Sequence, residues 1–169
     1  MASGVGSVKF DKRNEGKVAL VTGASSGIGA ATAIELSAAG FSSLVLVARN
    51  AEGLSETETS CKEAGAKSIL TLARDLENPK DVCEGIIDQT IKRFGRLDVV
   101  VNNAGFCVKS RVRDMKVEDI ESHMSVHLLT PMMLTKFALP HLEKTKGSLI
   151  YMASIAGTSL YPKDIGIYG

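Results

Sequence analysis

The sequence has no long apolar run, no excess of either charge and no paired cysteines, and each absence excludes a class of protein. Its 169 residues include 20 basic and 19 acidic side chains, for a formal net charge of +1, with no block of like charge. Nothing therefore favours a nucleic acid or a membrane surface as a partner. No apolar stretch approaches the roughly 20 residues that a membrane-spanning helix needs.

The three cysteines, Cys61, Cys83 and Cys107, lie far apart and include no CxxC pair. This pattern fits reduced thiols better than a disulfide framework and offers no metal-ligand spacing. Residues 1–16 have neither the apolar core of a signal peptide nor the acid-free pattern of a transit peptide. We therefore expect a cytoplasmic protein with a flexible tail over residues 1–16 and one domain over residues 17–169.

Apolar runs alternate with helical patterns along that domain. Val, Ile and Leu fill consecutive positions of the runs, which is typical of strands buried on both faces. The predicted strands are 17–22, 44–48, 68–73, 97–101 and 148–152, and the predicted helices are 28–39, 52–64, 79–94, 117–126 and 131–143. The alternation predicts an α/β fold with a doubly wound parallel sheet, Rossmann-like, in three αβα layers.

Glycine and proline mark the ends of these helices. Pro79 suits a first helical turn, because it has no N–H to leave unpaired there. Pro131 leaves two alternatives open, since it either starts a new helix or kinks a longer one. Four predicted helices are followed by a glycine, where a residue free to take a positive φ ends a helix: Gly40, Gly65, Gly95 and Gly147.

A glycine-rich turn with the pattern Gly-x-x-x-Gly-x-Gly follows the first predicted strand and begins the first helix. The first glycine permits a tight turn, and the later two let backbone approach a pyrophosphate and let the helix pack closely. The N–H groups and the positive end of the helix dipole would then face the phosphates. Ser25 and Ser26 suit a helix N-cap, hydroxyl contacts with phosphate or ribose, or both. The candidate cofactor residues of the turn are Gly23, Ser25, Ser26, Gly27, Ile28 and Gly29.

The residue at the end of the second predicted strand indicates which dinucleotide to expect. The position about 20 residues after Gly29, where NAD-binding proteins place an acid, is Arg49. A guanidinium can hold a 2′-phosphate through two charge-assisted hydrogen bonds. The sequence therefore predicts NADP(H) in preference to NAD(H), with a solvated surface arginine as the alternative.

Three landmarks together resemble the short-chain dehydrogenase/reductase family, over about residues 17–169. They are the glycine-rich turn, the Asn-Asn-Ala-Gly segment at 102–105, and Ser154 followed by Tyr168. The resemblance implies that Asp75 and Leu76 hold the adenine ring. It also implies that Asn103 contacts the cofactor ribose while Asn102 braces the sheet.

The resemblance further implies which residues are catalytic. Carbonyl reduction needs an acid for the developing oxyanion and a donor that holds it, and the family's tyrosine and serine correspond to Tyr168 and Ser154. His127 stands where the family usually has an asparagine that anchors a water of the proton relay. It either continues the relay or is a helix-packing histidine.

The resemblance thus implies an NADP(H)-dependent oxidoreductase that transfers hydride between NADPH and a small ketone or aldehyde, like a carbonyl or 3-oxoacyl reductase. The alternative is a non-catalytic nucleotide-binding or interaction protein. A methyltransferase is disfavoured by Arg49, because an acid usually holds the ribose hydroxyls of the methyl donor.

The family's chains continue past the position of Gly169 with a lysine four residues after the tyrosine, a sixth strand and much of the oligomer interface. We therefore expect a sheet that is incomplete at its C-terminal end, with the fifth strand as an unpaired edge. The 169-residue chain alone is expected to be poorly soluble or partly unfolded, with negligible turnover. A homo-oligomer is expected only of a longer form.

Overall fold

A computed structural model describes residues 11–157, so that Tyr168 lies outside the described residues. Five parallel strands form one sheet in the order β3-β2-β1-β4-β5. The strands are β1 (Val18–Thr22), β2 (Ser43–Ala48), β3 (Ser68–Ala73), β4 (Val99–Asn102) and β5 (Ser148–Tyr151). This order is that of a doubly wound sheet, and the predicted fold class is confirmed.

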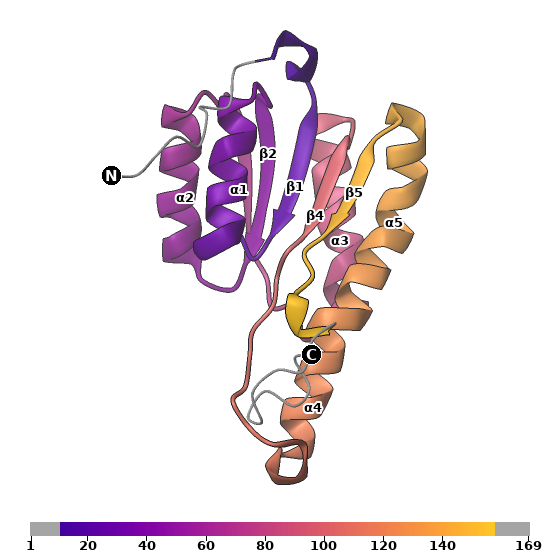
Figure 1. Ribbon diagram of the computed structural model, residues 1–169. Helices are drawn as coiled ribbons and strands as arrows, with labels where there is room; N and C mark the ends of the chain where they lie inside the picture. The colour runs from indigo at the N-terminus through magenta and orange to yellow at the C-terminus, as the bar shows by residue number, and fades with distance from the viewer. Residues whose placement is uncertain (1–10, 158–169) are drawn as a thin grey trace, which may run out of the picture.

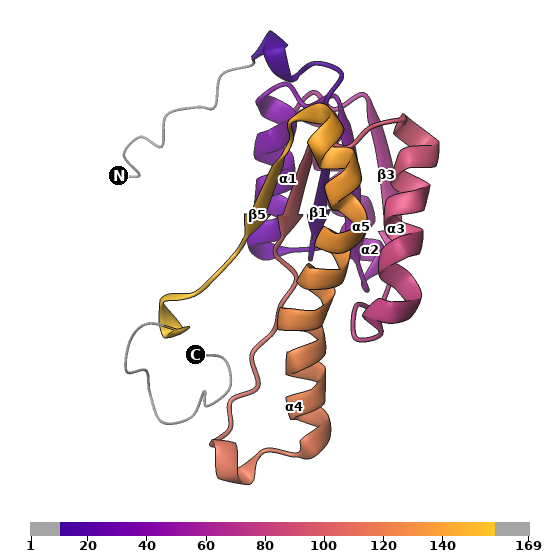
Figure 2. The ribbon, with the colours of Figure 1, turned by 90° about the vertical axis from the view of Figure 1, so that its right-hand side faces the viewer.

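Helices cover both faces of the sheet (Figure 1). One face carries α1 (Gly27–Ala38) and α2 (Ala51–Glu63), and the other carries α3 (Pro79–Phe94) and α5 (Thr130–Thr145). Figure 2 shows β3 and β5 at the two edges of the sheet, with α4 (Val117–Met124) extending beyond its carboxyl end. The described elements also include three short 3₁₀ turns: η1 (Lys12–Asn14), η2 (Val112–Asp114) and η4 (Ile155–Gly157).

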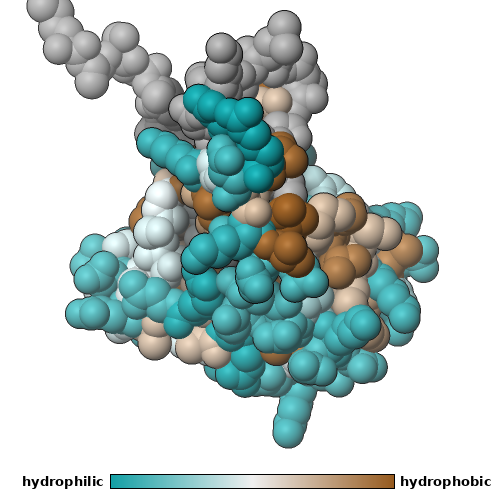
Figure 3. Space-filling model, turned by 90° about the horizontal axis from the view of Figure 1, so that it is seen from below, coloured by the Kyte–Doolittle hydropathy of each residue, from teal (hydrophilic) through white to brown (hydrophobic). Residues whose placement is uncertain are grey.

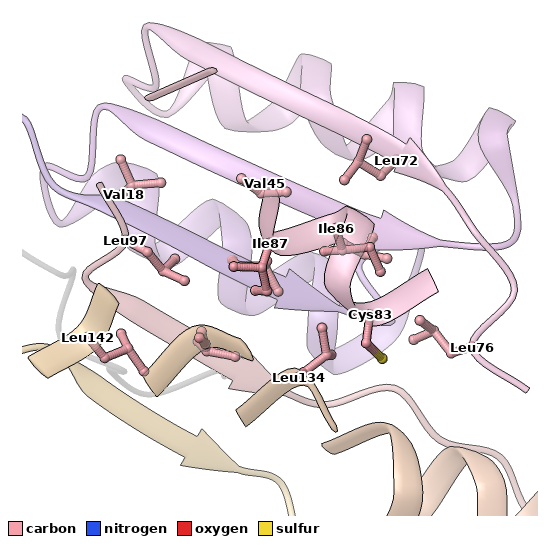
Figure 4. Packing of buried hydrophobic residues seen from close by; sticks show 14 residues of the cluster. Val18, Val45, Leu72, Leu76, Cys83, Ile86, Ile87, Leu97, Leu134 and Leu142 are labelled. Atoms are coloured by element: carbon pink, nitrogen blue, oxygen red, sulfur yellow. The ribbon is translucent and has the colours of Figure 1, made fainter. Parts of the chain in front are cut away.

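Each face of the sheet has its own hydrophobic core. Val18 and Leu20 of β1 point into the core under α3 and α5, which Figure 4 shows, whereas Ala19 and Val21 point into the core under α1 and α2. This explains the continuous apolar runs, because alternate residues of every central strand are buried on opposite faces. Cys83 lies in the first core, where burial raises the pKa of its thiol to about 11.

Residues 11–16 lie within the expected tail, yet they contact the domain. Asp11 N and Asn14 Nδ2 both donate to the carbonyl of Ala39, at 3.1 and 3.0 Å. Lys67 Nζ also lies 2.9 Å from Glu15 Oε1. These contacts attach η1 to the carboxyl end of α1.

Pro131 does not start a separate helix. The backbone continues as a right-handed helix from α4 through a π-helical segment, η3 (Ser125–Leu129), into α5. Within η3 the N–H of Thr130 donates to the carbonyl of Ser125, five residues earlier. A wider turn is a common way to accommodate a proline, which offers no N–H to the preceding turn. The longer-helix alternative is therefore the one that the structure supports.

Three of the four predicted helix-ending glycines take a positive φ, and the fourth prediction is wrong. Gly40, Gly65 and Gly95 have φ of +102°, +119° and +73°. After α5 it is Lys146 that adopts the left-handed conformation, with φ of 53°. Gly147 has a different role, because a Cβ there would collide with the carbonyl oxygen of Asp98.

The edge strand β5 pairs only with β4 among the described residues. Three large side chains at its end are about half exposed: Ile150 is 42% exposed, Tyr151 51% and the following Met152 46%. The expected unpaired apolar edge is therefore present in the described part of the chain. Within residues 11–157 no helix combines the length and apolarity required for crossing a bilayer.

Candidate functional site

A cleft of about 270 Å³ opens where β1, β2, β3 and β4 end. Four segments line it: 23–26 after β1, 48–50 after β2, 74–77 after β3 and 104–106 after β4, with Val126 beside them. Figure 3 views the molecule from this end and shows a mainly hydrophilic face with small hydrophobic patches. The carboxyl edge of an open parallel sheet is where such folds bind ligands.

Two glycines of the glycine-rich turn and the start of α1, Gly23 and Gly29, are required by the backbone and by close packing. Gly23 has φ of +67°, and a Cβ on it would lie 2.9 Å from Ala104 Cα. Gly29 has no such φ, but its Cβ would overlap the carbonyl oxygen of Gly23 and lie 2.6 Å from Asn103 Nδ2. Any larger side chain at either position would therefore push the turn away from the segment after β4.

The first turn of α1 has no side-chain cap among the described residues. Ser26 occupies the N-cap position with extended backbone, but its hydroxyl makes no capping hydrogen bond. Ser25 and Ser26 both line the cleft, whereas Ile28 is 64% exposed and lies outside its lining. Uncapped N–H groups together with the positive end of the helix dipole form a site that suits an anion.

Two arginines line the cleft side by side. Arg49 and Arg74 follow Ala48 and Ala73, which are register partners of β2 and β3, and Arg74 N donates to Ala48 O at 2.9 Å. Counting along the sequence identifies Arg49 but misses Arg74, whose position depends on the pairing of β3 with β2. Arg49 Nη1 lies 3.2 Å from Glu77 Oε1, and Arg74 Nη1 donates to Ala73 O at 2.9 Å.

The segment after β3 is fixed by hydrogen bonds to the long helix. Asp75 Oδ1 accepts from Glu77 N at 3.0 Å. The carbonyl of Leu76 accepts from Thr130 Oγ1, and that of Glu77 accepts from Ser125 Oγ, both at 2.6 Å. Leu76 also buries its side chain in the core under α3 and α5. The backbone of this cleft wall is therefore attached to η3 and to the start of α5.

The asparagine pair after β4 reverses one expected role. Asn103 Nδ2 donates to Thr22 O at 2.9 Å, and Thr22 Oγ1 accepts from the N–H groups of Asn103 and Ala104 at 2.9 and 3.0 Å. Asn103 is thus the residue that braces β1 against β4. Asn102, expected as the brace, is the last residue of β4, and its buried side chain has no hydrogen-bond partner within residues 11–157.

His127 lies on η3 and holds the segment after β4. Its Nε2 is 2.9 Å from the carbonyl oxygen and 3.2 Å from the nitrogen of Phe106. Its ring stacks on that of His123 with centroids 5.4 Å apart, and a Cβ on Gly105 would lie 2.7 Å from its Cε1. Desolvation by these neighbours lowers the pKa of His127.

Ser154 follows β5 in an exposed segment, and its Oγ accepts from Ala156 N at 3.1 Å. Tyr168, its expected partner, lies outside the described residues. The structure therefore brings together the segments expected to hold a cofactor and leaves the serine–tyrosine pair as a prediction.

A family model described as short chain dehydrogenase matches residues 17–168. The chain belongs to the short chain dehydrogenase family.

Named relatives and solved structures agree with this assignment. The chain is 38% identical over 156 residues to 11-beta-hydroxysteroid dehydrogenase-like 4A of Arabidopsis thaliana, covering 92% of this chain and 52% of the relative. It is 36% identical over 148 residues to 11-beta-hydroxysteroid dehydrogenase A of Sesamum indicum, covering 86% and 41%. The chain thus spans about half the length of the curated dehydrogenases that it matches.

Among solved structures, NAD⁺-bound xylitol dehydrogenase superimposes with a TM-score of 0.84 at 29% identity, covering 94% of this chain and 60% of that one. A metagenomic short-chain oxidoreductase in complex with NADP superimposes with a TM-score of 0.83 at 33% identity, covering 90% and 68%. Solved structures with the same fold therefore include complexes with either nicotinamide dinucleotide.

Proposed function

We propose that the chain supplies the cofactor-binding part and the catalytic serine and tyrosine of an NADP(H)-dependent oxidoreductase. The observation that carries the proposal is the cleft itself, which joins an uncapped helix N-terminus to two arginines and to the segment after β4. The residues present fit a nicotinamide dinucleotide, because the turn packs against the segment after β4 only while Gly23 and Gly29 lack a Cβ, and its helix N-terminus suits a diphosphate.

The preference for the 2′-phosphorylated cofactor rests on charge. Arg49 and Arg74 both line the end of the cleft at β2 and β3, and guanidinium groups bind phosphate through paired charge-assisted hydrogen bonds. The NADP complex of a similar short-chain oxidoreductase supports this choice. Other structures with the same fold bind NAD, so the preference has to be measured against NAD(H).

When bound, the reduced cofactor would supply a hydride to the carbon of a ketone or aldehyde. Tyr168 would donate the proton that the carbonyl oxygen needs, and Ser154 would hold that oxygen by a hydrogen bond. His127 forms a hydrogen bond with the Phe106 backbone, so we assign it the role of positioning the cleft wall at Phe106. A part in a proton relay would come in addition to that role. The names of the curated relatives favour a secondary alcohol or ketone of the hydroxysteroid kind, and a cytoplasmic location belongs to the same proposal.

Titration of the purified protein with NADPH and NADH tests the cofactor. NADPH oxidation with a panel of ketones tests the reaction and needs a longer form of the protein, because the 169-residue chain alone is expected to have negligible turnover. We expect tighter binding of NADPH, loss of that preference in Arg49→Ala, and a rate about a hundredfold lower in Ser154→Ala. Equal affinities for both dinucleotides in the wild type would refute the cofactor assignment. NADPH binding without turnover of any ketone would favour a non-catalytic nucleotide-binding protein.

A further inference from the structure

Glu77 is the closest charged partner that the structure gives Arg49. Arg49 Nη1 lies 3.2 Å from Glu77 Oε1, and the two side chains are 63% and 34% exposed. The proposed function assigns this same guanidinium to a phosphate. We propose that Glu77 is a specificity-determining residue: its carboxylate competes with the 2′-phosphate of NADP(H) for Arg49 and lowers the preference for NADP(H) over NAD(H). The inference rests on the proposed function.

The charges around this end of the cleft make the competition selective. Arg49 and Arg74 follow register partners on neighbouring strands, so their cationic side chains start from adjacent points of the sheet edge. A 2′-phosphate carries close to two negative charges at neutral pH and is repelled by a carboxylate beside the same cations. The 2′-hydroxyl of NAD(H) is neutral, and a carboxylate can accept its hydrogen bond. The charge of Glu77 therefore weakens the binding of NADP(H) more than the binding of NAD(H).

Contacts from the long helix keep the carboxylate of Glu77 in place. Its Oε2 accepts from Ser122 Oγ of α4 at 3.0 Å, while Oε1 faces Arg49. Its backbone is fixed as well, because Glu77 O accepts from Ser125 Oγ and Glu77 N donates to Asp75 Oδ1. A phosphate that takes over Arg49 would leave the bond to Ser122 intact. The carboxylate would then remain at the cleft as a fixed negative charge.

The variant Glu77→Gln isolates this charge. Glutamine has the same shape and retains an oxygen that Ser122 can bond, so the backbone contacts of the segment are preserved. Because the pair is partly exposed, its removal should change affinity by only about three- to fivefold. Ser122→Ala loosens the same carboxylate without removing its charge, and it should give a smaller change in the same direction. Glu143→Gln is the matched control, since Glu143 is exposed at the end of α5, remote from the cleft.

The experiment is a titration of purified wild type and the three variants with NADPH, NADH, 2′,5′-ADP and 5′-AMP, at low and high salt. We expect Glu77→Gln to lower the Kd of NADPH and of 2′,5′-ADP about three- to fivefold while the Kd of NADH and 5′-AMP change less than about twofold. Salt should reduce the difference, and Glu143→Gln should match the wild type. Urea denaturation of each variant establishes that the fold is retained.

The outcomes distinguish a failure of the role proposed for Glu77 from a failure of the proposed NADP(H) cofactor. If the wild type prefers NADPH through Arg49 but Glu77→Gln leaves the ratio of the two Kd values unchanged, the role of Glu77 is refuted and the proposed cofactor stands. If Glu77→Gln weakens NADPH binding, Glu77 positions Arg49 and does not compete for it, which also refutes the inference. A wild type that binds neither dinucleotide, or both equally, refutes the proposed cofactor itself.

Discussion

One added methyl group at Gly29 should damage the cleft more than the helix that carries it. Alanine is favoured over glycine within a helix by about 1 kcal/mol, and Gly29 has ordinary helical backbone. The added Cβ, however, would overlap the carbonyl oxygen of Gly23 and lie 2.8 Å from its carbon. These are backbone atoms that cannot rotate away, and overpacking of this kind costs about 1–3 kcal/mol. We therefore expect Gly29→Ala to lower the free energy of unfolding by up to about 2 kcal/mol.

The same displacement should weaken dinucleotide binding. Relief of the clash moves the 23–26 turn away from Asn103, whose Nδ2 is also only 2.6 Å from the added atom. If the shift costs about 1.4 kcal/mol of binding, the Kd rises tenfold. The assays are urea denaturation and titration with NADPH.

Two other glycines provide the comparison for Gly29→Ala. Gly85, inside α3, has open space around its Cβ position, so Gly85→Ala should stabilise the protein by up to about 1 kcal/mol. Gly27 also has open space but φ of +55°, so Gly27→Ala should cost about 1 kcal/mol through the backbone alone. A Gly29→Ala protein as stable as Gly85→Ala, with unchanged NADPH affinity, would refute the steric reasoning.

Three further substitutions test contacts of the sheet and of the site. Asp98 is buried and accepts from Val18 N at 2.9 Å and from Arg96 Nη2 at 2.6 Å; Asp98→Ala should cost about 2 kcal/mol in urea denaturation, mainly from the orphaned N–H of Val18. Thr22→Val keeps the shape but leaves the two N–H groups that Thr22 Oγ1 accepts unpaired, so a loss of about 2 kcal/mol and weaker NADPH binding are expected in the same two assays. Desolvation lowers the pKa of His127 below 6.5 in the folded state. The contribution of the neutral imidazole to the free energy of unfolding is therefore fully present above pH 6.5. It is lost as the pH falls through the folded pKa, because the unfolded chain binds the proton more readily. Thermal melts of His127→Asn from about pH 7 to 5 should show a shallower decline than the wild type, and parallel curves would contradict this assignment.

Local patterns in the sequence were sufficient to predict the sheet and most helix ends. Strand positions followed from continuous Val, Ile and Leu runs, because the central strands are buried on both faces. The failed predictions depend on contacts between distant segments. Gly147 lies against the carbonyl of Asp98, the residue before β4, and it is Lys146 that takes the left-handed conformation. Nothing near position 146 in the sequence indicates that contact.

In the cleft, too, local patterns predicted some residues, and contacts between distant segments decided the others. The spacing from Gly29 pointed to Arg49, because that relation lies within one strand–helix–strand unit. Arg74 was missed since its position beside Arg49 follows from the register of β2 with β3. The brace was expected of Asn102 and is formed by Asn103 for a related reason. Only the positions of β1 and β4 determine which of two adjacent amides reaches the carbonyl of Thr22.

The π-helical segment η3 connects two walls of the cleft, the segment after β3 and the segment after β4. No pattern in the sequence indicates this connection. Ser125 at its start and Thr130, the residue after it, donate to the carbonyls of Glu77 and Leu76, while His127 between them bonds the backbone of Phe106. The wall expected to meet the adenosine end of the cofactor and the wall beside the nicotinamide end are thus fixed by one short stretch of helix. A regular α-helix would rotate these side chains relative to one another, because its turn holds fewer residues.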